Sequence, residues 1–167
     1  MKKSLLVLPL AAAAVFVMGC SSTPSSTVSM GVTTVSEETA EVNVASLAEE
    51  LNSQVEFGED LTKLDDAGLE RVYRIEASEF TEAAGYTGSG ATVDQISVWK
   101  ASDDAAAQKI EDALRDFLDT QIDSYSTYMP DEVPKLEDAV LKRSGVYVAL
   151  CVSEDAAKAS EIISAAF

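Results

Sequence analysis

The segment from residue 146 to 152, VYVALCV, constrains the fold of this chain more than any other stretch. Alternate residues of a strand point to opposite faces, and here both alternating sets are apolar. One set comprises Val146, Val148, Leu150 and Val152, and the other comprises Tyr147, Ala149 and Cys151. A strand that is apolar on both sides has to be covered on both sides, so the segment predicts a central strand of a layered sheet.

The segments around this strand alternate between helical and strand periodicity. Apolar residues recur at helical spacing in 43–53, 65–73, 102–125 and 154–167. Extended segments are expected on both sides of the glycine-rich turn at 85–90, and again in AVLKR, residues 139–143. The order α-α-β-β-α-β-β-α predicts an α+β domain: a four-stranded antiparallel or mixed sheet with helices packed on it.

The helix expected in 102–125 carries the one polar residue that stands out. Its apolar side chains form a face about 140° wide, as expected for a helix that lies on a sheet. Gln121 falls inside that face. A polar side chain there must either find a hydrogen-bond partner, such as a loop backbone, or line a cleft. Gln121 is therefore a candidate binding residue.

The N-terminal residues have the form of a secretory signal. Lys2 and Lys3 precede an apolar run over 5–18, which is too short for a membrane span of about 20 residues. The following residues, Val17-Met18-Gly19-Cys20, resemble the bacterial lipobox. The resemblance implies cleavage after residue 19 and acylation of Cys20 with diacylglycerol and palmitate-like chains, which anchor stably together. The alternative is a chance cysteine at the end of an ordinary signal peptide.

The residues after Cys20 differ in composition from the rest of the chain. They are rich in serine and threonine, which is typical of a flexible tether, with an O-glycosylated stalk as the alternative. The predicted organisation is a lipoprotein signal peptide at 1–19, a lipidated tether at 20–42 and a single α+β domain at 43–167. The predicted location is the extracytoplasmic side of the cell membrane.

Charge and residue usage exclude several classes of function. The chain has 29 acidic and 12 basic residues, a net charge of −17, so nucleic acid is a poor partner. It contains no histidine, which excludes Ser-His-Asp and Cys-His catalysis and histidine-ligated zinc. With Cys20 acylated, Cys151 has no disulfide partner and is expected to be a small buried hydrophobe.

Several segments, in this order, resemble one family. They are DQISVWKA, a helix with Arg115, Gln121 and Tyr125, YMP at 128–130, and KRSGVYVALCVSED. They resemble the uncharacterised Gram-positive lipoproteins known as domain of unknown function 4358, over about residues 43–167. The resemblance implies a compact α+β domain outside the cytoplasmic membrane, and it implies no catalytic residue.

These features predict a membrane-anchored, non-catalytic binding or interaction module without cofactor or metal. Its partner would be an envelope protein or a small ligand. The candidate binding residues are Trp99, Gln121, Tyr125 and Tyr128, each of which has packing as its alternative role. Trp99 is expected to be covered by the N-terminal helices or exposed to a partner. The alternative functions are a small carboxylate-based envelope enzyme and a cation-binding protein.

Overall fold

The structure is a computed structural model that describes residues 41–167. The predicted signal peptide, Cys20 and most of the predicted tether lie outside the described residues. In chain order the elements are α1 (Val44–Gln54), β1 (Thr62–Lys63), α2 (Asp66–Tyr73), the 3-10 turn η1 (Ala77–Glu79), β2 (Phe80–Thr87), β3 (Gln95–Ala101), α3 (Asp104–Tyr128), the 3-10 turn η2 (Pro130–Glu132), α4 (Val133–Glu137), β4 (Val140–Ser144), β5 (Tyr147–Val152) and α5 (Ala156–Ala166).

The sheet is antiparallel throughout, with the strand order β1-β2-β3-β5-β4. The prediction of an α+β domain is confirmed, but the prediction of four strands is wrong. The fifth strand, β1, has only two residues, both exposed, and pairs Thr62 with Thr87 and Lys63 with Tyr86. Backbone pairing defines this edge strand, and two residues are too few for a strand periodicity to show in the sequence.

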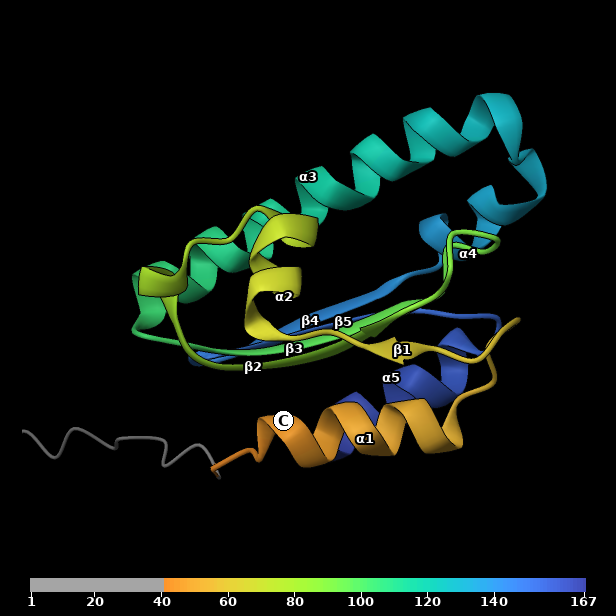
Figure 1. Ribbon diagram of the computed structural model, residues 1–167. Helices are drawn as coiled ribbons and strands as arrows, with labels where there is room; N and C mark the ends of the chain where they lie inside the picture. The colour runs from red at the N-terminus through yellow and green to blue at the C-terminus, as the bar shows by residue number, and fades with distance from the viewer. Residues whose placement is uncertain (1–40) are drawn as a thin grey trace, which may run out of the picture. The chain divides into compact units, whose positions relative to one another are not determined.

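Helices cover both faces of the sheet, so the domain has three layers (Figure 1). One apolar core lies between the sheet and the pair α1 and α5, and a second core lies beneath α2, α3 and α4. All six residues of β5 are buried, and its two apolar sets divide between the two cores. The predicted central strand is therefore confirmed.

Short polar side chains determine where the helices begin. Asp103 caps α3 by accepting a hydrogen bond from the backbone N–H of Ala106 at 2.7 Å, and Asp155 caps α5 in the same way through Lys158 at 2.9 Å. Asn43 and Asp65 cap α1 and α2. Each side chain satisfies a backbone donor that has no partner within its helix, which fixes where the helix begins.

A glycine allows α2 to approach the sheet closely. A Cβ atom on Gly85 would lie 2.6 Å from the carbonyl oxygen of Ile96 and 2.8 Å from Cδ2 of Leu69. Both distances are too short for any side chain at this point of β2. Glycine at this position therefore permits the contact between Leu69 of α2 and β2.

Candidate functional site

A concave surface runs along α3 on the side that faces α2. One compartment, of about 400 Å³, lies between the end of α2 and the middle of α3. A second, of about 230 Å³, lies between α3 and the loop that joins β2 to β3. Val72, Phe117 and Gln121 line both compartments, so the two form one continuous surface, which we call the α3 groove.

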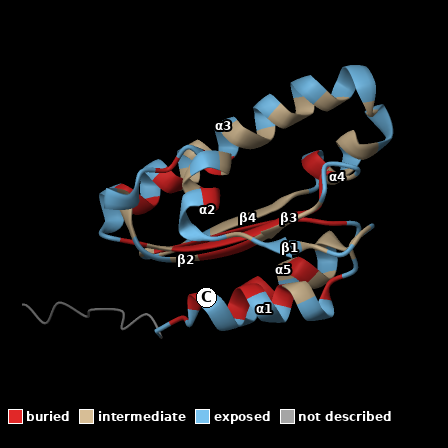
Figure 2. Ribbon diagram, viewed as in Figure 1, coloured by how far each residue is buried: buried red, intermediate tan, exposed pale blue. Residues whose placement is uncertain are grey.

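The groove arises because the apolar side chains of α3 are fully buried only in the first half of the helix. Ile110 and Leu114 are buried against the sheet, whereas Phe117, Ile122 and Tyr125 are half-buried. Figure 2 shows the buried residues of α3 confined to its N-terminal half, while the C-terminal half extends away from the sheet. The sequence predicts one apolar face along the whole helix. In the structure, the first half of that face is more deeply buried than the second half.

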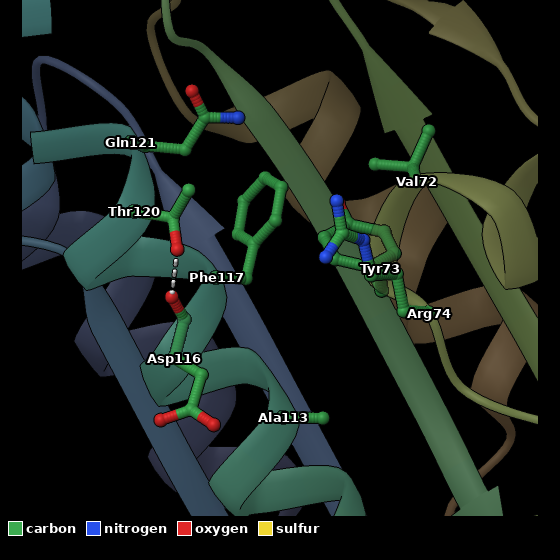
Figure 3. Close-up of a pocket in the computed structure, with 8 residues that line it drawn as sticks. All are labelled: Val72, Tyr73, Arg74, Ala113, Asp116, Phe117, Thr120 and Gln121. Carbon is green, nitrogen blue, oxygen red and sulfur yellow. Dashed lines mark hydrogen bonds between the residues drawn. The ribbon is translucent and has the colours of Figure 1, made fainter. Parts of the chain in front are cut away.

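Two of the four predicted binding residues line the groove. Gln121 lies between Phe117 and Tyr125 on successive turns of α3, and its amide is directed over the first compartment (Figure 3). Within residues 41–167 the Gln121 side chain has no hydrogen-bond partner that could account for it as a packed core residue. Of the two alternatives for a polar residue on this face, lining a cleft is the one observed.

The other two predicted residues lie elsewhere. Trp99 is fully buried, with its ring 5.8 Å from that of Tyr73 and 5.1 Å from that of Phe80. Burial beneath α2 rules out direct contact between Trp99 and a partner in this conformation. Tyr128 is 61% exposed at the end of α3 and packs its ring 4.8 Å from that of Tyr125, outside the two compartments.

The structure adds groove residues that the sequence analysis missed. Tyr73 donates a hydrogen bond of 3.0 Å to Oε1 of Gln95, and both side chains are buried at the base of the groove. Gln95 carries the same sequence signal as Gln121, a polar side chain on an apolar face, so the same argument applied to β3 would have found it. Asp116 and the loop residues 87–92 gave no such signal because they look like ordinary exposed positions.

Arg74 is a further groove residue, and its backbone is unusual. It ends α2 in the left-handed conformation, with φ 57° and ψ 35°. Among the described residues it is the one non-glycine residue with a positive φ, a conformation that costs about 1–2 kcal/mol for most residue types. Arg74 makes no ion pair with any residue of 41–167, and its guanidinium lies on the α2 side of the ring of Phe117 (Figure 3).

A cluster of charges surrounds the buried carboxylate of Asp94. The carboxylate of Asp94, whose side chain is fully buried, accepts a 2.7 Å hydrogen bond from the backbone N–H of Gly58 and lies 3.5 Å from Nζ of Lys135. Lys135 also lies 3.1 Å from Glu132 and 3.2 Å from Glu154. The cluster therefore joins α4 to the start of β3 and to the loops that follow α1 and β5.

Several ionisable groups near the groove and the cores have shifted pKa values. Burial raises the pKa of Tyr125 to about 12, with Tyr128 as a further cause. Hydrogen bonds from Ser89 and Thr92 lower the pKa of Glu59, which thereby holds the loop between β2 and β3. Burial raises the pKa of the Cys151 thiol to about 12, as expected for a buried, unreactive cysteine.

The described residues contain neither a metal-binding cluster nor a membrane-spanning helix. Within residues 41–167, no cluster of three or more Cys, Asp or Glu side chains has the arrangement needed to hold a metal ion. In the same part of the chain, none of the helices combines the length and the apolar character of a membrane span.

Comparisons with known proteins give one match. Residues 53–153 match the family described as Domain of unknown function (DUF4358). No curated protein and no solved structure matches the chain. The matched residues include the whole sheet and the α3 groove, whereas most of α1 and all of α5 lie outside them. Because the match spans more than half of the sequence, the chain belongs to the DUF4358 family.

Proposed function

We propose that this protein is an extracytoplasmic lipoprotein, anchored to the membrane through Cys20, whose domain is a non-catalytic binding module. The α3 groove is its binding surface. The observation that carries the proposal is the uneven burial of α3. Phe117, Gln121 and Tyr125 line a concave surface on a helix whose preceding turns bury their apolar residues in the core. Ligand sites are typically concave and combine apolar walls with a few polar groups, as this groove does.

The position at which the chain enters the domain supports the same proposal. Residues 41–43 lead into α1, which packs on the face of the sheet opposite to α3 (Figure 1). The described chain therefore begins on the face of the sheet away from the groove. The groove then stays accessible to a ligand in the cell envelope.

The charges near the groove favour binding over carboxylate catalysis. A general acid at neutral pH needs a raised carboxylate pKa, which burial or a neighbouring acid provides. Glu59, which holds the loop beside the groove, instead has a lowered pKa, through hydrogen bonds from Ser89 and Thr92. The alternatives are a small carboxylate-based enzyme and a cation-binding protein.

The anchor is tested by metabolic labelling with an alkyne-bearing fatty acid. We expect label on the wild-type protein, none on Cys20→Ala and full label on Cys151→Ala, because Cys151 is buried. Label that persists in Cys20→Ala would contradict a lipid anchor at this residue.

The binding surface is tested by photo-crosslinking in intact envelopes. A photoreactive amino acid replaces Gln121 in the groove or, as the control, Gln54 at the end of α1 on the opposite face of the sheet. We expect adducts with envelope material from position 121 and none from position 54. Equal adducts from both positions, or none from either, would overturn the assignment of the groove.

A further inference from the structure

The α3 groove presents its groups in an ordered row. Phe117, Gln121 and Tyr125 are spaced four residues apart, so successive side chains lie about 6 Å apart along the helix axis. The row therefore alternates an aromatic ring, an amide and a second aromatic ring. Half-burial fixes the two rings while leaving part of each accessible.

The wall opposite this row is polar but uncharged over most of its length. Thr87 ends β2, Ser89 and Thr92 come from the loop between β2 and β3, and Gln95 lies at the base. The loop is held in place, since Thr92 donates a 2.9 Å hydrogen bond to Glu59. Gln95 and Thr92 already bond within the protein. Hydroxyl groups can both donate and accept hydrogen bonds, so the bonding positions that the hydroxyls of this wall have left suit a ligand rich in neutral hydroxyl groups.

The charges in the groove disfavour a strongly charged ligand. Arg74 and Asp116 line the same compartment and have opposite signs, and Asp94 at the base of the other compartment is paired with Lys135. The chain as a whole carries a net charge of −17, which repels anions at long range. A basic peptide would be attracted to the domain, but the positive charge of Arg74 would repel it inside the groove.

We propose that the α3 groove binds a neutral saccharide. A sugar ring has apolar C–H faces, which pack on aromatic rings, and equatorial hydroxyl groups, which bond to amides and hydroxyls. Phe117 and Tyr125 supply the rings, and Gln121, between them, supplies a donor and an acceptor. The inference rests on the proposed function and adds to it the chemical class of the ligand.

The test uses titrations of the full-length protein with four probes. The protein is solubilised in a detergent without a sugar headgroup, so that the detergent does not compete for the site. The saccharide probes are chitotriose and maltotriose, and the charged probes are trilysine and triglutamate. The readouts are calorimetry and the NMR signals of the glutamine side-chain amides. We expect saturable binding of at least one trisaccharide, with the Gln121 amide shifted, and no binding of the peptides.

Three variants sharpen the test. Gln121→Ala removes hydrogen bonds worth about 1.4 kcal/mol in total, so it is expected to weaken saccharide binding about tenfold. Tyr125→Leu removes one ring at a half-buried position and is expected to weaken binding by a similar factor. Gln54→Ala, on the opposite face of the sheet, is expected to leave the affinity unchanged.

Three results would overturn the inference: no saturable binding of either trisaccharide, binding that the groove variants leave unchanged, or preferential binding of a charged peptide. Each of these is distinguishable from failure of the proposed function. Adducts formed from position 121 in envelopes would still establish a binding surface, with a ligand of another class.

Discussion

The two halves of α3 carry the same apolar pattern and end in different environments. Ile110 and Leu114, in the first half, are fully buried between α3 and the sheet. Ile122 and Tyr125, in the second half, are half-buried beside the groove. The pattern of a helix therefore predicts which side faces the protein, but not how deeply each turn is buried. The difference separates the part of α3 that stabilises the domain from the part that is available to a ligand.

The largest expected effect on stability comes from the charge cluster around Asp94. Its cation, Lys135, lies in α4, the helix that follows α3 in the chain. Lys135→Met leaves Asp94 buried without its cation, which typically costs about 3–5 kcal/mol of unfolding free energy. Urea denaturation measures the loss. The control is Lys158→Met, because the exposed pair of Lys158 with Glu161 is worth at most about 1 kcal/mol. Equal losses in the two variants would show that the buried cluster does not stabilise the domain.

A matched pair of truncations compares the two halves of α3 directly. Leu114→Ala is expected to lower the unfolding free energy by about 2–5 kcal/mol, because the residue is fully buried. Ile122→Ala is expected to cost about 1 kcal/mol, since its side chain is already partly in contact with water. The two unfolding midpoints in urea provide the measurement. Similar losses would mean that the second half of α3 is packed in solution as tightly as the first.

Alkaline pH distinguishes the buried Tyr73 at the base of the groove from the half-buried Tyr125 on its wall. Burial raises the pKa of both Tyr73 and Tyr125, the latter to about 12, so above pH 10 the unfolded chain loses these protons while the folded protein retains them. Stability therefore falls as the pH rises from 10 to 12. The slope is at most about 1.4 kcal/mol per pH unit for Tyr73. It is smaller for Tyr125, which solvent partly screens.

The measurement is urea denaturation between pH 9 and pH 12. Cys151→Ala serves as the background, because the raised pKa of Cys151 destabilises the protein in an overlapping range. Tyr73→Phe is expected to flatten the decline more than Tyr125→Phe does. The reverse order would place Tyr125 in the less accessible environment and contradict the open groove.

The smallest expected effect concerns the backbone beside the groove. Arg74→Gly is expected to raise the unfolding free energy by up to about 1 kcal/mol, because glycine adopts the left-handed conformation without strain. Arg71→Gly, three residues earlier within α2, is the control. It is expected to lower the unfolding free energy by about 1 kcal/mol. Destabilisation by both substitutions would show that contacts of the Arg74 side chain outweigh its backbone strain.

Much of the fold was predictable because its determinants are local. The helical spacing of apolar residues in 43–53 falls on Val44, Leu47, Ala48 and Leu51, and these are the four residues that α1 buries. Asp103 and Asp155 are of a residue type that caps helices, and both do cap the helices that follow them. Periodicity and capping act within a few residues of sequence, so a single sequence contains them.

The candidate site was only partly predictable because it depends on distant contacts. Gln121 signalled a cleft through its position on an apolar face, but the opposite wall comes from residues 87–95. Asp94 and Lys135 are 41 positions apart, and nothing local to either residue indicates the pairing. The left-handed backbone of Arg74 is likewise imposed by the end of α2 rather than by the residue type.

The strand order has a consequence for how the protein folds. β3 and β5 are neighbours at the centre of the sheet, yet α3, α4 and β4 lie between them in the chain. Contacts between distant segments close slowly, because a long loop has to be ordered first. A nascent chain that ends within α3 therefore presents the bare edge of β3, which is prone to pair with other strands. Synthesis of the last quarter of the chain is what completes the sheet and removes that exposed edge.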